Sequence, residues 1–313
     1  MIEVINPGVL STIQDFGRYG YRYYGVPISG AMDWYALRVA NILVGNPENT
    51  AGIEATLCGL KIRACEEVQV AITGGDLSPC TREEPVPLWK PFWLKKNEIV
   101  SFPRRKSGFR AYLAVRGGID VPMIMKSSST MLKAGFGGTG GKLKPGDILK
   151  TGNSLNLKRI KFRPLPKENV PEYKTNIHLS VLAGPQSDCF TTEQIKIFLN
   201  SEYEIESQSD RQGYRLNGSE IKHVEGHDLI TEAVWPGAIQ IAGNGLPIIL
   251  LADAQVTGGY PKIASVISAD LDKLGQAKPS DKIHFKEVSL NKAHHLLSKK
   301  EKVIKHIKRL FWD

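Results

Sequence analysis

The sequence predicts a mainly β protein built from two β-rich domains with a few helices, and three observations support this. The 313 residues include 30 glycines and 18 prolines, with valines and isoleucines spread throughout, which favours short strands and turns over a helical bundle. Residues 152–176 lack periodicity and carry three prolines, which is typical of a linker. The blocks on either side of this linker close with similar segments, each a Lys-Pro turn, an Asp and a strand. These segments are LKPGDIL at 143–149 and AKPSDKIHF at 277–285. We therefore expect domains at residues 1–155 and 175–313.

Turns separate the strand-like runs of the first block. These runs are LKIRAC at 60–65, VQVAITG at 68–74, EIVSFP at 98–103 and FRAYLAVRGG at 109–118. One helix is expected at residues 33–43, because Asp33 is a suitable N-cap and apolar residues recur after it with helical spacing. Gly45 follows at a position where glycine commonly ends a helix.

The second block is expected to begin with a strand, IHLSVLAG at 177–184. Thr191 and Gln194 form a capping-box pattern that predicts a helix over residues 192–199. Two apolar runs, GAIQIAGNG at 237–245 and PIILLAD at 247–253, read as buried strands. An amphipathic helix is expected over residues 290–310. Its apolar face consists of Ala293, Leu296, Leu297, Ile304 and Ile307.

Composition argues against several classes of protein. No run of about 18 apolar residues occurs, and the first residues lack the pattern of a signal peptide, so we expect a cytoplasmic protein without a membrane partner. The four cysteines form no CxxC pair and the seven histidines form no HExxH motif. We therefore expect reduced, mostly buried thiols and no bound metal.

The net charge of +9 is concentrated in one place. Residues 289–313 hold seven Lys or Arg against Glu301 and Asp313, which accounts for +5 of the total. We interpret this as the solvated face of the last helix and expect no nucleic-acid partner. An arm that binds an acidic partner or nucleic acid would carry the same charge.

Three glycines, Gly135, Gly137 and Gly140, match the spacing G-x-G-x-x-G. That motif binds phosphate when a helix follows it, so that the helix N-terminus faces the anion. Here Pro145 and Gly146 follow and should prevent a helix. We therefore interpret the segment as a glycine loop, and the sequence reveals no ATP site.

Three other segments combine charges with turn residues, and each has a plain structural alternative. The loop at 14–33, which ends at Asp33, can bring backbone N–H groups and the guanidinium of Arg18 to an anionic ligand, but it also fits a structural Ω-loop. The segment SDRQGYRLNG at 209–218 carries a tyrosine between two arginines, which suits the grip of a carboxylate or phosphate, but also a surface turn. The segment TGGYPK at 257–262 permits close approach of a ligand, or forms a tight turn. The candidate binding residues are Arg18, Asp33, Tyr214, Arg215, Thr257, Gly258, Gly259 and Tyr260, and the candidate catalytic residues are Arg211 and Lys262.

Taken together and in order, many segments resemble one family, the KipA family, also called allophanate hydrolase subunit 2 or the C subunit of 5-oxoprolinase. The similar segments include GVLSTIQDFGRYGY at 8–21, GVPISGAMD at 25–33, AGPQSDCF at 183–190, SDRQGYRLNG and TGGYPKIA. The resemblance implies two cyclophilin-like β-barrel domains. The sequence departs from the family pattern at Gln212, Ala254 and Ser280, which leaves the exact substrate open.

The resemblance also implies partners and a reaction. The chain would act with a KipI-like protein (the B subunit of 5-oxoprolinase) and a LamB/YcsF-type protein (the A subunit) in the ATP-dependent opening of 5-oxoproline to glutamate. Two alternatives remain. The chain could be a regulator that antagonises a KipI-like histidine-kinase inhibitor, or a carboxyltransferase component that acts on urea or a related amide. No Ala-Met-Lys-Met biotin-attachment site is present in the sequence.

Overall fold

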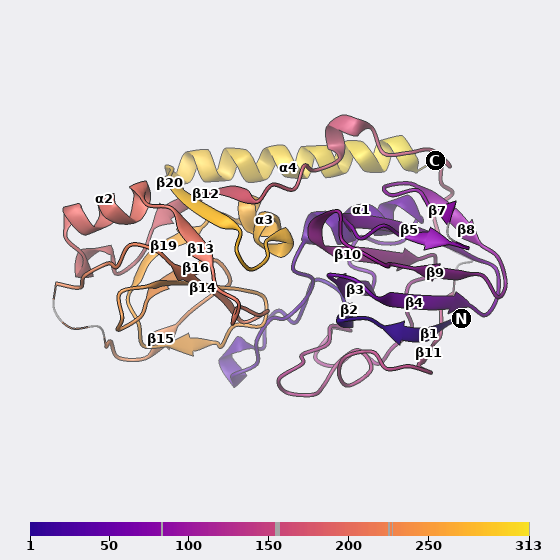
Figure 1. Cartoon of the computed structure of the whole chain (residues 1–313), viewed down its shortest axis with the longest axis horizontal. Helices are drawn as coiled ribbons and strands as arrows, with labels where there is room; N and C mark the ends of the chain where they lie inside the picture. Colours follow the sequence, from indigo (N-terminus) through magenta and orange to yellow (C-terminus); the bar gives the residue numbers. More distant parts are fainter. Residues whose placement is uncertain (83, 154–156, 225, 227, 313) are drawn as a thin grey trace. The chain divides into compact units, whose positions relative to one another are not determined.

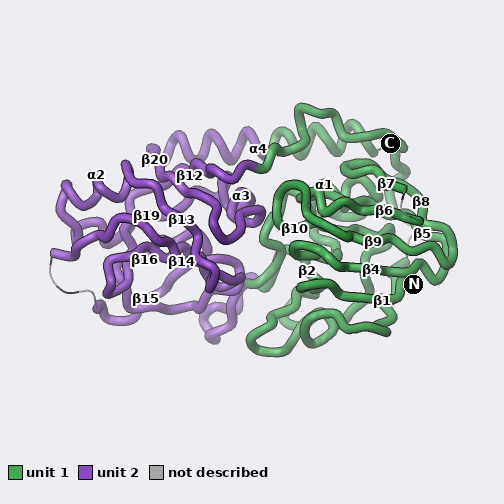
Figure 2. Tube along the Cα trace, in the orientation of Figure 1, with its two compact units in different colours: residues 1–18, 29–173, 301–313 green, residues 19–28, 174–300 purple. Residues whose placement is uncertain are grey.

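The computed structural model describes residues 1–82, 84–153, 157–224, 226 and 228–312. These residues form two compact units (Figure 2). Unit 1 comprises residues 1–18, 29–173 and 301–313, and unit 2 comprises residues 19–28 and 174–300. Each unit therefore contains segments that are far apart in the sequence.

The strands of unit 1 form two β-sheets (Figure 1). The six-stranded sheet has the order β11 (Ile148–Leu149), β1 (Ile2–Pro7), β4 (Leu60–Ala64), β9 (Ile99–Ser101), β6 (Cys80–Thr81) and β7 (Glu84–Pro85). The five-stranded sheet has the order β2 (Leu10–Gln14), β3 (Gly52–Thr56), β10 (Ser107–Val115), β5 (Val68–Asp76) and β8 (Pro91–Leu94). All of their strand pairs are antiparallel.

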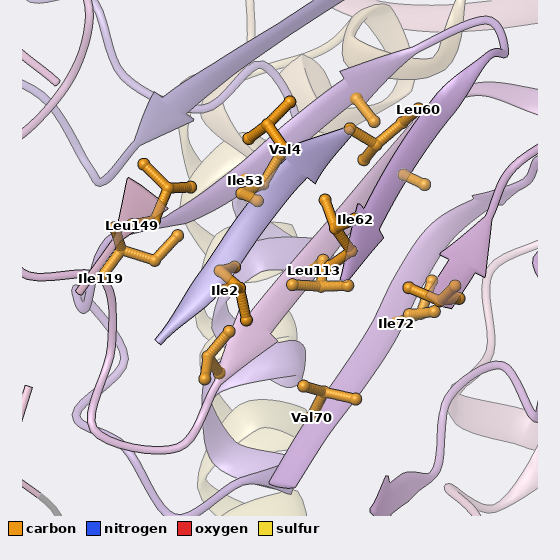
Figure 3. Close-up of a cluster of buried hydrophobic side chains, with 14 of the residues drawn as sticks. Ile2, Val4, Ile53, Leu60, Ile62, Val70, Ile72, Leu113, Ile119 and Leu149 are labelled. Carbon is orange, nitrogen blue, oxygen red and sulfur yellow. The ribbon is translucent and has the colours of Figure 1, made fainter. Parts of the chain in front are cut away.

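A hydrophobic core joins the two sheets (Figure 3). Ile2 and Ile62 contribute to it from the six-stranded sheet, and Ile53, Ile72 and Leu113 from the five-stranded sheet. Strand β4 alternates between buried and more exposed positions, as expected of a strand with one covered face, whereas β3 is buried throughout.

Helices cover the second face of the five-stranded sheet. Helix α1 (Trp34–Leu43) packs against β5 and β10, and its partners in the same cluster include Ile304, Ile307 and Phe311 of helix α4 (Leu290–Phe311). The predicted N-cap is confirmed, because the Asp33 carboxylate accepts a hydrogen bond from the Ala36 N–H at 2.8 Å.

Unit 2 is built around a closed barrel of seven strands. Their order is β12 (Asn176–Ala183), β19 (Lys262–Val266), β16 (Ala238–Ile241), β17 (Pro247–Leu250), β14 (Gly213–Asn217), β13 (Tyr203–Ile205) and β20 (Lys282–Glu287). Strand β12 runs parallel to β20 and closes the barrel. A separate two-stranded ribbon, which we call the β15–β18 ribbon, pairs β15 (Glu232–Ala233) with β18 (Thr257–Gly258).

Short helices complete the chain. Helix α2 (Thr192–Asn200) begins as predicted, because the Thr191 side chain accepts a hydrogen bond from the Gln194 N–H. Helix α3 (Leu271–Gln276) precedes β20, and single turns of 3-10 helix occur at η1 (Arg22–Tyr24), η2 (Lys167–Asn169), η3 (Ser187–Cys189) and η4 (Ser268–Asp270). The amphipathic helix expected over residues 290–310 is confirmed as α4.

The mainly β prediction is confirmed, but only one of the two predicted barrels is observed as a closed barrel. Within the described residues of unit 1, the strands form two open sheets. The edge strands of the six-stranded sheet, β7 and β11, have only two residues each.

The compact units also divide the chain differently from the predicted domains at 1–155 and 175–313. Residues 19–28 belong to unit 2, and residues 301–313 belong to unit 1. Much of the predicted linker packs within unit 1, where Leu165 is buried in the same cluster as helix α1. Residue 155, the predicted end of the first domain, lies outside the described residues.

Three further observations concern the described residues alone. No helix among them is both long and apolar enough to cross a membrane. No group of three or more His, Cys, Asp or Glu residues in these ranges is arranged to hold a metal ion. The four cysteines are free thiols, and they are half-buried, which corrects the expectation that most would be buried.

Candidate functional site

Lys262 lies at the start of strand β19 in unit 2, and only 1% of its side chain is exposed. Its ammonium group donates a hydrogen bond to Oε1 of Glu232, whose side chain is 43% exposed. The Lys262 Nζ also lies 5.8 Å from the ring centroid of Trp235, within the usual range of a cation–π interaction. The lysine thus extends from the interior of the unit to a carboxylate at its surface.

Gln186 provides a second donor to the same carboxylate. Its Nε2 donates to Oε1 of Glu232 at 2.5 Å, while its Oε1 accepts a hydrogen bond from the backbone N–H of Lys262 at 3.3 Å. One carboxylate oxygen of Glu232 therefore accepts hydrogen bonds from both an ammonium and an amide group.

The segment 257–260 lies against the other side of this cluster. Gly258 pairs directly with Glu232 in the β15–β18 ribbon. A Cβ atom at Gly258 would lie 2.8 Å from Nε2 of Gln240, so the absence of a side chain allows this close approach. Gln240 is buried, is the partner of Lys262 in the β16–β19 ladder, and donates to the carbonyl of Tyr260 at 3.2 Å.

Arg22 anchors the loop at 19–28 to the β15–β18 ribbon. Its Nη2 donates to the carbonyl oxygen of Val234 and, at 3.1 Å, to that of Val256. Partial burial lowers the pKa of Arg22, because desolvation penalises the charged guanidinium. A segment from early in the chain thereby binds the residue that directly follows β15 and the residue that directly precedes β18.

Arg211 forms a buried ion pair within unit 2. Its Nε and Nη2 donate to the two carboxylate oxygens of Asp253 at 2.9 and 3.1 Å, and both side chains are 5% exposed. The sequence suggested that this guanidinium could grip a ligand carboxylate with two parallel hydrogen bonds. In the structure, the carboxylate of Asp253 already accepts the two hydrogen bonds that the Arg211 guanidinium would give to such a ligand.

Tyr214 and Arg215 occupy opposite faces of strand β14. Tyr214 is buried, and its hydroxyl lies 3.0 Å from the carbonyl oxygens of both Leu274 and Ala277. Arg215 is exposed. The structure therefore does not place Arg211, Tyr214 and Arg215 around one ligand, and the contacts of Tyr214 favour a role in holding helix α3.

Arg18 belongs to unit 1 and is fully buried there. Its Nη2 donates to the carbonyl of Ser129, and its guanidinium carbon lies 4.7 Å from the ring centroid of Phe136. Nearby, the buried Asp15 carboxylate accepts hydrogen bonds from Ser127 Oγ at 2.6 Å and Ser129 Oγ at 2.5 Å, and also from the backbone N–H groups of residues 17 and 128. The predicted glycine loop folds over this cluster as hydrogen-bonded turns.

Asp33 is also buried in unit 1. Besides capping helix α1, its carboxylate accepts from the hydroxyl of Tyr173 at 3.3 Å. Its backbone N–H donates to the hydroxyl of Tyr112, which in turn donates to Glu54 at 2.7 Å. Burial, reinforced by the negative charges of Glu54 and Asp33, raises the pKa of Tyr112 well above its usual value.

The structure thus brings five of the predicted residues, Thr257, Gly258, Gly259, Tyr260 and Lys262, to one cluster in unit 2. The sequence-based reasoning missed Glu232, Gln186, Trp235 and Gln240 as members of this cluster. Gln240 was detectable, because a glutamine inside the apolar run GAIQIAG is an unusual core residue. Glu232 carried no signal, since its segment shows neither periodicity nor a motif.

Comparison with known proteins identifies the family. The model of the carboxyltransferase domain, subdomain A and B, matches residues 24–287. The chain belongs to this carboxyltransferase family. Its sequence is 36% identical over 314 residues to the C subunit of 5-oxoprolinase from Escherichia coli. The alignment covers 100% of this chain and 98% of that protein. The resemblance inferred from the sequence is therefore confirmed.

Members of the carboxyltransferase family also occur as parts of longer proteins. Urea amidolyase of Saccharomyces cerevisiae is 36% identical over 98% of this chain, which spans only 18% of that protein. In the crystal structure of the K. lactis urea amidolyase, the similar region superposes with a TM-score of 0.92 at 33% identity, covering 98% of this chain and 20% of that chain.

Proposed function

We propose that this carboxyltransferase-family chain is the C subunit of an ATP-dependent 5-oxoprolinase. In the proposed reaction, water opens the lactam C–N bond of 5-oxoproline to give L-glutamate, and ATP is hydrolysed to ADP and phosphate. The observation that carries the proposal is the end-to-end match to the C subunit of 5-oxoprolinase from Escherichia coli. The matches to urea amidolyase, in contrast, cover only a fifth or less of those longer proteins.

The cluster around Lys262 is the part of the chain that we expect to contact the substrate. 5-Oxoproline is a flat, five-membered lactam that carries a carboxylate. Lys262 supplies a buried positive charge and Trp235 an aromatic face. A buried cation can bind an anionic group or stabilise charge on a carbonyl oxygen during the reaction. We regard Arg211 as a positioning residue, because Asp253 already binds its guanidinium.

The proposal includes partners, since the Escherichia coli relative is named as one subunit of an enzyme. We propose that a KipI-like protein (the B subunit) and a LamB/YcsF-type protein (the A subunit) complete the enzyme in the cytoplasm, and that ATP binds only in that complex. The glycine segment at 135–140 gives no support for ATP binding by this chain alone, because turns and the short strand β11 follow it in the described residues up to 153.

A second candidate function is transfer of a carboxyl group to urea or a related amide. Sequence identity of 36% to the S. cerevisiae urea amidolyase favours it. Under this alternative, the same cluster would bind a small planar amide, and a biotin-carrying protein would be needed.

The test is reconstitution. The chain, the KipI-like protein and the LamB/YcsF-type protein are purified separately and mixed, and glutamate and phosphate release are measured with 5-oxoproline as substrate. We expect turnover of 5-oxoproline only when all three proteins are present. Lys262→Met should abolish turnover, whereas Lys286→Ala, an exposed lysine on β20, should leave it unchanged. Full activity of the single chain, or none in the mixture, would contradict the proposal.

A further inference from the structure

The side chain of Lys262 is buried, yet that of Glu232, whose carboxylate binds the ammonium, is exposed. The side chain of Lys262 is 1% exposed and that of Glu232 is 43% exposed. A buried charge needs a partner, because desolvation without one is costly. An exposed carboxylate supplies this partner but gains little net free energy, since water competes for it. Another carboxylate could therefore take its place.

The two donors to Glu232 are also held by contacts that do not involve Glu232. The backbone of Lys262 is fixed in strand β19, which pairs with β12 and β16 of the barrel, and its buried side chain is confined beside the ring of Trp235. The amide of Gln186 is oriented by the backbone N–H of Lys262, which donates to its Oε1. We therefore expect the ammonium and the amide N–H to stay near the same point if Glu232 left.

The carboxylate acceptor is held less firmly than its donors. Glu232 lies on β15, a strand of two residues whose ladder partner among the described residues is β18. The β15–β18 ribbon is separate from the hydrogen-bonded ladders of the barrel. A change in the rotamer of the exposed Glu232 side chain would uncover the donors without breaking a barrel strand.

The walls beside the donors suit a flat ring. The indole of Trp235 is fixed by a hydrogen bond from its Nε1 to Ser265 Oγ at 2.9 Å, and its ring centroid lies 5.8 Å from Lys262 Nζ. A flat ring bearing a carboxylate could pack on the indole while its carboxylate meets both donors.

We infer that Lys262 and Gln186 form a subsite for a small carboxylate, and that Glu232 fills this subsite until the ligand displaces it. The naming of 5-oxoproline as the ligand rests on the proposed function, whereas the carboxylate chemistry follows from the two donors. Glu232 then acts as an internal competitor, so removing its charge should strengthen binding.

The experiment compares Glu232→Gln with Glu220→Gln, which removes the same charge from an exposed residue of unit 2. Binding of three compounds is measured by isothermal titration calorimetry at low salt, with the chain alone and with the three proteins mixed. 5-Oxoproline has the lactam and the carboxylate, 2-pyrrolidinone has only the lactam, and cyclopentanecarboxylate has only the ring and carboxylate. Quenching of tryptophan fluorescence, with Trp235→Phe as control, reports whether the ligand lies near Lys262.

Glu232→Gln should bind both carboxylates about tenfold more tightly than Glu220→Gln, the size expected when a competing charge-assisted hydrogen bond is removed. The affinity for 2-pyrrolidinone should not change. Equal shifts for all three compounds, no shift, or no binding of any carboxylate would overturn the inference. Stronger binding of cyclopentanecarboxylate without 5-oxoproline turnover would support the subsite and count against the proposed function. If Lys262→Met turned over 5-oxoproline with an unchanged KM, the result would support the proposed function and count against the subsite.

Discussion

Replacing Arg211 with alanine should destabilise unit 2 before it affects any ligand. The guanidinium of Arg211 binds both carboxylate oxygens of Asp253, and each side chain is 5% exposed. Alanine would leave the Asp253 carboxylate buried without this partner. Removing one member of a buried ion pair typically costs about 3–5 kcal/mol. That is a large share of the roughly 5–15 kcal/mol by which natural domains are stable.

The assay is urea denaturation followed by circular dichroism and tryptophan fluorescence. With a denaturant dependence of about 1–3 kcal/mol per molar, the loss corresponds to a fall in the urea midpoint of at least about 1 M. Arg215→Ala is the matched control, because this exposed arginine lies on the neighbouring strand β14 and should change stability by less than about 0.5 kcal/mol.

A double variant separates charge from packing. Arg211→Met combined with Asp253→Leu removes both charges and keeps apolar volume, which is often neutral or stabilising at buried pairs. It should therefore recover most of the stability lost in Arg211→Ala. The same urea midpoint in Arg211→Ala and Arg215→Ala would show that the buried pair does not stabilise unit 2. A loss of activity in Arg211→Ala can be ascribed to substrate contact only when the midpoint is unchanged.

Three other outcomes are expected. Gly258→Ala should cost about 1–3 kcal/mol in the same denaturation assay, because its Cβ would lie 2.8 Å from Nε2 of Gln240; an unchanged midpoint would show that the ribbon yields freely. Above about pH 10, the folded state keeps the proton of Tyr112 and the unfolded state loses it, so stability should fall as the pH rises. Tyr112→Phe should flatten the slope of stability against pH. Parallel slopes in the two proteins would argue against the raised pKa. Asp15→Ala should lower stability by at least about 1.5–3 kcal/mol through loss of charge-assisted hydrogen bonds. The control variant Asp120→Ala, at an exposed position, should not lower it. Equal melting temperatures of these two variants would refute the prediction.

Features that depend on neighbouring residues could be predicted from the sequence. The caps at Asp33 and Thr191 follow from side chains that bind a backbone N–H three residues later. The long amphipathic helix followed from the spacing of its apolar residues. Within the candidate site, Lys262 and the segment 257–260 could be grouped from the sequence because they are adjacent in it.

Features that depend on distant pairing could not be predicted. Arg211 and Asp253 are 42 positions apart, and Lys262 and Glu232 are 30 apart, so no local pattern connects either pair. The contacts of Arg22 could not be predicted for the same reason, because its partners lie more than 200 residues away in the sequence. These contacts place residues 19–28 in unit 2. A strand pattern also does not reveal whether its sheet closes, which depends on how edge strands meet in space.

The division of the chain between the two units has a consequence for its biosynthesis. The ribosome releases residues from the N-terminus onward, yet unit 1 needs Ile304, Ile307 and Phe311 to complete the hydrophobic cluster around helix α1. Unit 1 therefore begins to emerge first but is completed only when residues 304–311 have been made, and the apolar surface of α1 stays uncovered until then. A nascent chain of this kind is a natural client for a chaperone. For the same reason, expression of residues 1–173 alone should yield an aggregating fragment and not a folded domain.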